Sequence, residues 1–241
     1  MSQNRSVQST AKSTADDLEV ADFLAKVKEL AVAPGDGRGR LVFAMDATMS
    51  RQPTWDMALG LQADMFKAIK STGGLDVQLV YFRGLDECRA SKWVSDPEAL
   101  AKLMTSVKCH GGYTQIRKVL NHASKAAAAK RVNAVVYVGD SMEEEIDDLC
   151  AAAGELTLLG VPVFLFQEGH DARAARAFRE IARLTNGATL RFDSGAANEL
   201  RQLLAAVAAY AAGGQKALRQ LGRTSRGEGA RRLLAQMKPT D

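Results

Sequence analysis

The sequence lacks several features that would define its class at once. Only three cysteines occur in 241 residues, Cys88, Cys109 and Cys150, and no C-x-x-C pair or Cys/His ligand spacing is present. This odd, scattered set excludes a disulfide framework and a zinc site, and it indicates reduced thiols in a cytosol-like compartment. No apolar run approaches the roughly 20 residues that span a bilayer, and the polar N-terminus has no secretory h-region. We therefore expect a cytoplasmic protein without a membrane segment.

Charge is nearly balanced outside one segment. The net charge is +4 and the isoelectric point is about 9.0, but residues 213–241 alone hold seven basic and two acidic residues. The remainder is therefore close to neutral. The basic isoelectric point describes a C-terminal segment rather than a nucleic-acid-binding face, so we expect nucleic acid to bind only weakly, through that segment.

Hydrophobic periodicity predicts strands that alternate with helices. Apolar runs typical of strands occupy residues 40–45, 77–82, 88–93, 132–138, 161–166 and 188–192. Helical spacing occupies residues 53–71, 97–107, 114–130, 143–159, 172–185 and 196–212. A hairpin-length loop before 88–93 makes that strand antiparallel. The predicted fold is α/β: a doubly wound, mostly parallel six-stranded sheet with one antiparallel edge strand and helices on both faces.

The chain divides into four predicted segments. Residues 1–16 are rich in Ser, Gln and Thr and are predicted to be disordered. Residues 17–36 form a predicted helix and linker, and 37–212 form the α/β domain. Residues 213–241 are predicted to be a basic, largely flexible tail, because glycines among arginines make a poor helix and a poor core.

Oxygen-bearing side chains follow the predicted strands, where ligands bind in open α/β sheets. They are Asp46, Thr48, Ser50, Thr114 and Asp140. Two carboxylates and three hydroxyls suit a hard cation such as Mg²⁺ or Mn²⁺. Taken singly, each residue also fits a helix N-cap, so the prediction of a metal site depends on their common position.

Three short stretches together resemble the metal-ion-dependent adhesion site (MIDAS) of von Willebrand factor A (VWA) domains. That family carries D-x-S-x-S, then a Thr in a Gly-rich loop, then an Asp after the fourth strand. The matching stretches here are Asp46-Ala47-Thr48-Met49-Ser50, Gly111-Gly112-Tyr113-Thr114 and Gly139-Asp140-Ser141. Thr48 replaces the first Ser, which keeps the hydroxyl and adds a methyl group. The resemblance covers residues 38–212 in element order and implies a VWA protein of the intracellular, bacterial type.

The resemblance also implies a function, that of a docking module rather than an enzyme. Ser50, Thr48 and Thr114 would contact Mg²⁺ or Mn²⁺ directly, and Asp46 and Asp140 would hold the ion partly through water. A protein partner would supply an Asp or Glu to the open position of the ion. The residues expected on the partner-binding rim are Arg51, Tyr113, Met142 and Glu143. We expect the chain itself to be a monomer.

Two other functions remain open from the sequence. Asp46 and Asp140, each at the end of an apolar strand, also resemble the motifs of haloacid-dehalogenase-like, Mg-dependent phosphatases. Those enzymes usually place a second Asp, the general acid/base, where Thr48 stands, and this sequence has no clear strand-end Lys. In the third reading, the same residues only cap helices in a metal-free structural interaction domain. Binding of Mg²⁺ or Mn²⁺, and then phosphatase activity, distinguishes the three.

Overall fold

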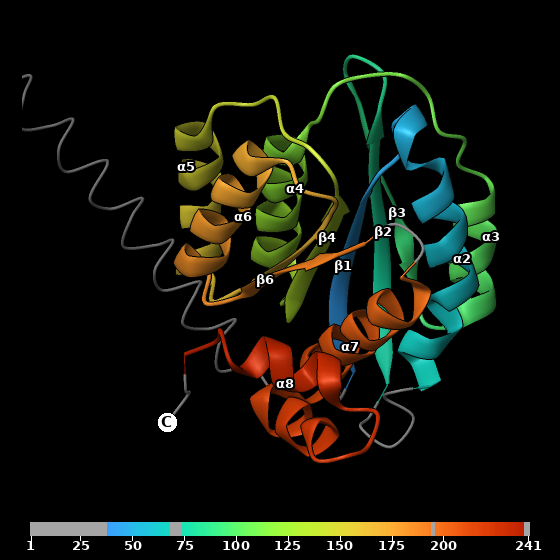
Figure 1. Cartoon of the computed structure of the whole chain (residues 1–241), viewed down its shortest axis with the longest axis vertical. Coiled ribbons are helices and arrows are strands. Elements are labelled where there is room, and N and C mark those ends of the chain that lie inside the picture. Colours follow the sequence, from blue (N-terminus) through green and yellow to red (C-terminus); the bar gives the residue numbers. More distant parts are fainter. Residues whose placement is uncertain (1–37, 68–73, 194–195, 239–241) are drawn as a thin grey trace, which may run out of the picture.

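The structure is a computed structural model that describes residues 38–67, 74–193 and 196–238 (Figure 1). The predicted disordered segment 1–16 and the predicted helix and linker 17–36 lie outside the described residues.

Within these described residues, six strands form one sheet in the order β3-β2-β1-β4-β5-β6. Their bounds are β1 Gly39–Asp46, β2 Leu75–Arg83, β3 Glu87–Val94, β4 Ala134–Gly139, β5 Val163–Glu168 and β6 Ala188–Phe192. Only the pair β2–β3 is antiparallel, and every other neighbouring pair is parallel. The predicted fold class is confirmed, including the antiparallel edge strand.

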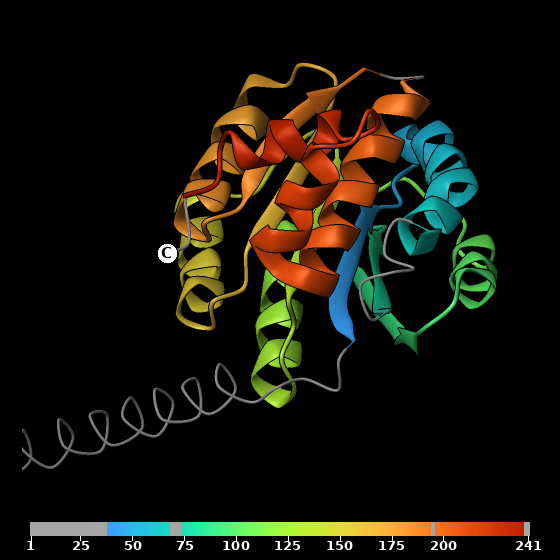
Figure 2. The same ribbon diagram turned by 90° about the horizontal axis from the view of Figure 1, so that it is seen from below.

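Helices cover both faces of this sheet (Figures 1 and 2). One face carries α4 (Ile116–Ala129), α5 (Ile146–Leu158) and α6 (Ala172–Leu184), and the other carries α2 (Gln52–Lys67), α3 (Pro97–Thr105) and α7 (Ala197–Gly222). Alternate residues of β1 face opposite layers, with Phe43 in the α2–α7 core and Val42 in the α4–α6 core. This burial on both sides explains why the parallel strands are continuously apolar in sequence.

The strand order reverses between β1 and β4, and this reversal creates the crevice where ligands bind in such sheets. From β1 the chain goes outward through β2 to β3, and from β4 it goes outward in the other direction through β5 to β6. Met45 pairs with Val138 at the end of the β1–β4 ladder. Asp46 and Asp140 therefore leave the sheet next to each other.

A glycine holds the loop that precedes α4 against the β2–β3 turn. The amide of Tyr113 donates to the carbonyl oxygen of Gly84 at 3.1 Å, and a Cβ at Gly112 would lie only 2.1 Å from that same oxygen. The amide of His110 also donates to the carbonyl of Ala47 at 3.0 Å. The close approach at Gly112 joins this loop to the β2–β3 turn, and the His110 hydrogen bond joins it to the loop that follows β1.

The C-terminal segment differs from the sequence prediction. Helix α7 continues past residue 212 with a break at Gly213 and Gly214, where Gly214 has φ +63°, and a further helix, α8 (Glu228–Leu234), packs on it (Figure 2). The prediction that residues 213–241 form a largely flexible tail is therefore wrong for the described part, 213–238. Leu218 of α7 and Leu233 of α8 are fully buried in the core on the α2–α7 side of the sheet. This burial offsets the poor helix propensity of the glycines.

The same segment covers the outer edge of β6. The side-chain amide of Gln236 accepts from the Thr189 N–H at 3.0 Å and donates to the Thr189 carbonyl at 2.8 Å. Arg232 donates to the carbonyl of Arg191 at 3.2 Å. Side chains from α8 and the residues after it thus form hydrogen bonds with backbone groups that an edge strand otherwise leaves unpaired.

The buried leucine of α8 provides a test of this packing. We expect Leu233→Ala to lower the free energy of unfolding by about 2–4 kcal/mol, because it removes a fully buried side chain from a packed core. Arg226→Ala, at an exposed position between α7 and α8, should change it by less than about 0.5 kcal/mol. Urea denaturation measures both values, and equal effects would contradict the packing described here.

Candidate functional site

Asp46 closes β1 as a buried carboxylate with one unpartnered oxygen. Its side chain is 1% exposed. The Oδ1 atom accepts a hydrogen bond from the Thr48 amide at 2.7 Å, while Oδ2 has no hydrogen-bond partner among the described residues. Buried polar atoms nearly always find a partner in folded proteins, so this oxygen marks a position where a donor or a cation would be stabilised.

The environment of Asp46 changes its acidity. Burial raises its pKa to about 6, although the hydrogen bonds from Thr48 act in the opposite direction. The negative charge of Asp140 raises the pKa further, and the positive charge of Arg51 lowers it. The carboxylate is therefore ionised at neutral pH, but at a cost to folding that a bound cation would offset.

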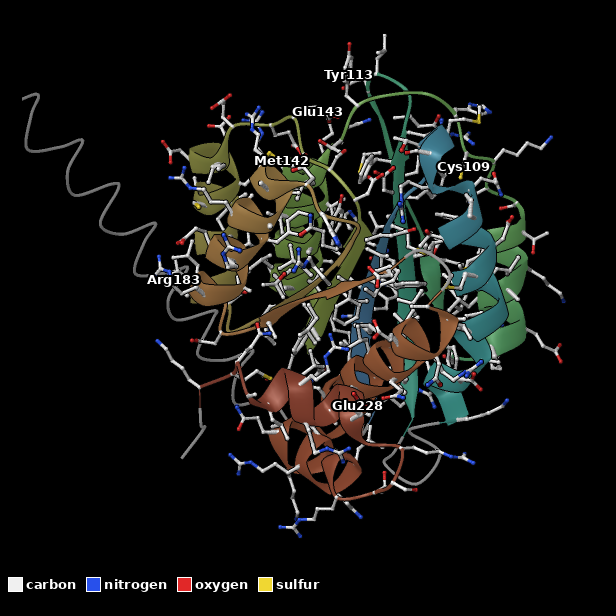
Figure 3. The ribbon with its side chains drawn as sticks, in the orientation of Figure 1. Cys109, Tyr113, Met142, Glu143, Arg183 and Glu228 are labelled. Carbon is white, nitrogen blue, oxygen red and sulfur yellow. The ribbon has the colours of Figure 1, made fainter. Side chains whose placement is uncertain are left out.

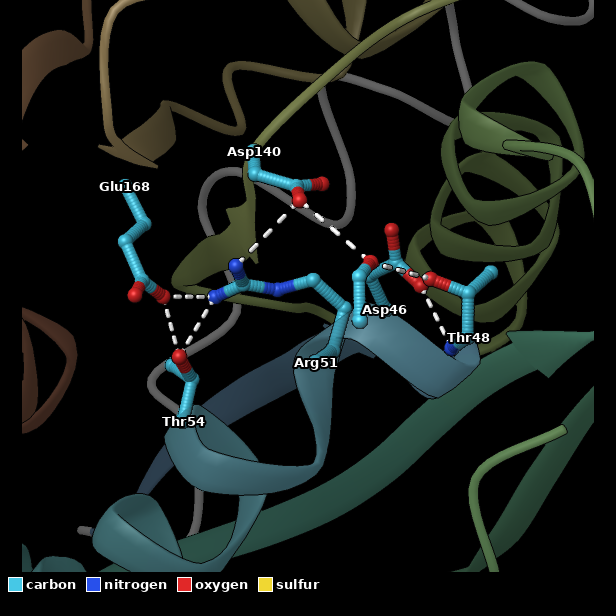
Figure 4. Close-up of polar contacts among 7 residues, drawn as sticks. Asp46, Thr48, Arg51, Thr54, Asp140 and Glu168 are labelled. Carbon is cyan, nitrogen blue, oxygen red and sulfur yellow. Dashed lines mark hydrogen bonds and ion pairs between the residues drawn. The ribbon is translucent and has the colours of Figure 1, made fainter. Parts of the chain in front are cut away.

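Thr48, Ser50 and Asp140 bring further side-chain oxygens close to Asp46; Figure 4 labels Asp46, Thr48 and Asp140. The 3₁₀ turn η1 (Met49–Arg51) curls the chain here. It places Thr48 Oγ1 3.4 Å from Ser50 Oγ, and Ser50 Oγ 3.5 Å from Asp140 Oδ2. Thr48 precedes η1 but makes no side-chain capping hydrogen bond. Helix capping thus does not account for the Thr48 hydroxyl.

Thr114 is held by a different partner. Its amide and its hydroxyl both donate to Glu143 Oε2, at 2.8 and 2.7 Å, and the Glu143 amide donates back to the Thr114 hydroxyl at 3.1 Å. The next acid, Glu144, accepts from the amides of Ile116 and Arg117 at 2.7 and 2.9 Å. Glu143 and Glu144 thus accept hydrogen bonds from backbone amides at and just before the start of α4, where free N–H groups favour negative charge.

Arg51 lies inside the site rather than on its rim. Its side chain is 4% exposed, and its Nη1 lies 3.4 Å from Asp140 Oδ2. Its Nη2 donates to Thr54 Oγ1 at 2.6 Å and pairs with Glu168, which also accepts from the Thr54 hydroxyl. Figure 4 shows the guanidinium between the two carboxylates. The prediction that Arg51 belongs to an exposed rim is wrong, because two carboxylates hold the guanidinium below the surface.

The other predicted rim residues differ in their exposure. Met142 is 3% exposed and packs in the α4–α6 core, so its assignment to the rim is also wrong. Tyr113 is 60% exposed and projects from the body of the molecule beside the β2–β3 turn (Figure 3). Glu143 is exposed as well. Tyr113 and Glu143 are therefore the accessible members of the predicted rim, and their contact with a partner stays a prediction.

Sequence reasoning missed Glu168 and Thr54. Glu168 is the last residue of β5, so it occupies the same strand-end position that singled out Asp46. Thr54 lies in the first turn of α2 and is 2% exposed. The strand-end rule was sufficient to find Glu168, whereas only the folded chain shows that Thr54 and Arg51 meet it.

The oxygen atoms at the crevice fit a hard cation in chemistry. In residues 38–67, 74–193 and 196–238, no group of three or more His, Cys, Asp or Glu residues could hold a metal. A cation at this crevice would therefore depend on two carboxylates with hydroxyls, which are ligands that Mg²⁺ accepts. The unpartnered Asp46 oxygen favours such an ion. The guanidinium beside Asp140 opposes it.

Comparison with known proteins identifies the fold. No protein-family model matches the sequence, and no curated protein matches it significantly. Similar solved structures include a von Willebrand factor type A protein from Catenulispora acidiphila, with a TM-score of 0.57 and 17% identity over 71% of this chain and 43% of that one. An aerotolerance-related membrane protein from Bacteroides fragilis gives a TM-score of 0.54 and 18% identity over 69% of this chain and 96% of that one. The SpRpn10 VWA domain gives a TM-score of 0.53 and 12% identity over 73% and 97%.

These similarities define a VWA fold, and at identities of 18% or less they define nothing beyond the fold. The match spans less than half of the Catenulispora chain. In the part of the chain that the structure describes, every helix is too short or too polar to cross a membrane.

The raised pKa of Asp46 predicts a specific pH dependence of stability in chelator. A raised pKa in the folded state means that ionisation of Asp46 destabilises the fold. This destabilisation is absent below about pH 4 and complete above about pH 6. Relative to wild type, Asp46→Asn should gain about 2–3 kcal/mol of unfolding free energy between pH 4 and pH 7.5. Denaturant unfolding at several pH values measures this difference, and parallel pH profiles for the two proteins would refute it.

Proposed function

We propose that this protein is an interaction module, an adaptor or scaffold, that docks an acidic residue of a protein partner on a bound Mg²⁺ or Mn²⁺ ion. Asp46, Thr48, Ser50 and Asp140 would hold the ion, and Thr114 would join them if its hydroxyl leaves Glu143. The observation that carries this proposal is the buried, unpartnered Asp46 oxygen beside the Thr48, Ser50 and Asp140 oxygens. Their place where the strand order reverses supports the same conclusion.

The chemistry of these ligands favours docking. Two carboxylates neutralise a divalent ion, and hydroxyl groups donate little further charge, so the ion remains attractive to an incoming anion. Mg²⁺ requires six oxygen ligands in octahedral geometry, and a carboxylate from a partner can fill a position that the chain leaves open. Such a charge-assisted contact adds to an interface but does not form one alone. Exposed neighbours such as Tyr113 would contribute the rest.

We propose docking rather than catalysis for two reasons. An attacking carboxylate must reach its substrate, and Asp46 is 1% exposed at the end of a buried strand. The nearby thiol of Cys109 is also a poor nucleophile, because burial raises its pKa to about 11 and the reactive form is the thiolate. Among the described residues, we find no nucleophile activated by a base of its own.

Metal binding provides the first test. We expect one divalent ion per chain in calorimetric titrations with Mn²⁺ and Mg²⁺, and we expect Asp46→Ala to abolish that binding while the far-ultraviolet circular dichroism is retained. Asp64→Ala removes the same charge from the last turn of α2, the opposite end of that helix from the Ser50 loop, and should bind like wild type. Unchanged binding by Asp46→Ala would place the ion elsewhere.

Partner release provides the second test. A partner captured from the cell of origin in Mg²⁺ should dissociate when a chelator is added, without unfolding of the domain. Ser50→Ala should abolish capture, because it removes a metal ligand with almost no change in volume, and the exposed Ser225→Ala should not. A partner that stays bound through both chelator and Ser50→Ala would show that its interface lies elsewhere.

A further inference from the structure

Asp140 of the proposed metal site belongs to one connected polar cluster with Arg51, Thr54 and Glu168 (Figure 4). Arg51 lies between Asp140 and Glu168, and the Thr54 hydroxyl, in the first turn of α2, donates to Glu168. Arg51 and Glu168 are 4% and 8% exposed. A buried charge requires compensation by a partner, so the cluster is a constrained feature of the fold rather than a chance surface contact.

The guanidinium contacts its two carboxylates through different nitrogens. Nη2 has two partners, Glu168 and the Thr54 hydroxyl, whereas Nη1 has a single, longer contact of 3.4 Å with Asp140. Arginine presents several N–H donors in a fixed plane and can serve two acceptors at once. Arg51 is therefore anchored on the Glu168 side, and its contact with Asp140 is the weaker one.

The Asp140 oxygen that Arg51 contacts is also the one that lies near the Ser50 hydroxyl. Asp140 Oδ2 receives Nη1 of Arg51 and lies 3.5 Å from the Ser50 hydroxyl. A divalent ion held by Ser50 and Asp140 would face a positive charge at the same oxygen atom. An ion bound at this oxygen must share it with Arg51 or displace the guanidinium toward Glu168.

We propose that Arg51 is a tethered cation that competes with the divalent ion for Asp140, and that Glu168 sets the strength of this competition by holding Arg51 back. Arg51 and Glu168 are positioning residues in this account, since neither binds the ion. The inference deepens the proposed docking function and rests on it. It gives the site a moderate, adjustable affinity for the ion instead of permanent occupancy.

The two charges have opposite expected effects on ion binding. Without the Glu168 carboxylate, the guanidinium has Asp140 as its remaining anionic partner, so Glu168→Gln should weaken Mn²⁺ binding about tenfold. Arg51→Gln combined with Glu168→Gln removes the competitor and its tethering carboxylate together, so neither of these two positions keeps a charge. We expect this double variant to bind Mn²⁺ more tightly than wild type, by about threefold to tenfold. A purely structural role for the pair predicts weaker binding in both variants.

Calorimetric titration with Mn²⁺, and separately with Mg²⁺, tests this inference on the full-length chain. The control is Arg201→Gln with Asp64→Asn, which removes an exposed ion pair of the same type between α7 and α2; its affinity should stay within about twofold of wild type. Thermal melts in chelator establish that each variant is folded. Because the double variant keeps no buried charge at either position, it remains informative if Glu168→Gln alone is poorly folded.

Each outcome gives a separate answer. Tighter binding in the double variant than in wild type supports the competition, including the case where wild type binds no ion within the measured range. Ion binding in wild type with equal or weaker binding in the double variant overturns the role of Arg51 and leaves the docking function intact. The absence of ion binding in both proteins overturns the docking function and this inference together.

Discussion

The parallel pairing of β1 with β4 is the interaction on which the whole site depends. Its ladder runs from Leu41 opposite Ala134 to Met45 opposite Val138, and it sets the ends of the two strands level. Because successive side chains of a strand point to opposite faces, a shift of one residue in this register would exchange the two apolar cores. It would also separate Asp46 from Asp140. Packing of the two cores thus fixes the strand register, and the register fixes where the loops after β1 and β4 begin.

Most of the fold could be predicted from the sequence, because parallel strands buried on both faces are continuously apolar. The C-terminal helices could not be predicted by the same reasoning. Gly213, Gly214 and Gly222 lower local helix propensity, whereas Leu218 and Leu233 gain more by entering a core formed by residues far away in sequence. Propensity is a local quantity and burial is not. Sequence reasoning therefore underestimated structure where tertiary packing decides the outcome.

The candidate site divides along a similar line. The strand-end rule found Asp46 and Asp140, since the position of a residue after a strand is visible in the sequence. The burial of Arg51 was not visible, because it depends on Glu168, 117 residues away. An arginine next to a predicted ligand was interpreted as a surface residue, and the acids Glu143 and Glu144 were not recognised as partners of the α4 N-terminus. Charge pairs between residues far apart in the sequence could not be predicted from the sequence alone.

The contact between Gln236 and Thr189 has a consequence for how the molecule behaves in a crowded solution. A carboxamide has the same donor and acceptor groups as a peptide unit, so Gln236 acts as a strand one residue long. The sheet is terminated there by its own chain. Strand-to-strand aggregation begins when an exposed edge pairs with the backbone of another molecule. At β6 that pairing must first displace the Gln236 side chain, which follows a helix packed on α7. The C-terminal segment thus protects the β6 edge of the sheet from pairing with another molecule, a role unrelated to any ligand.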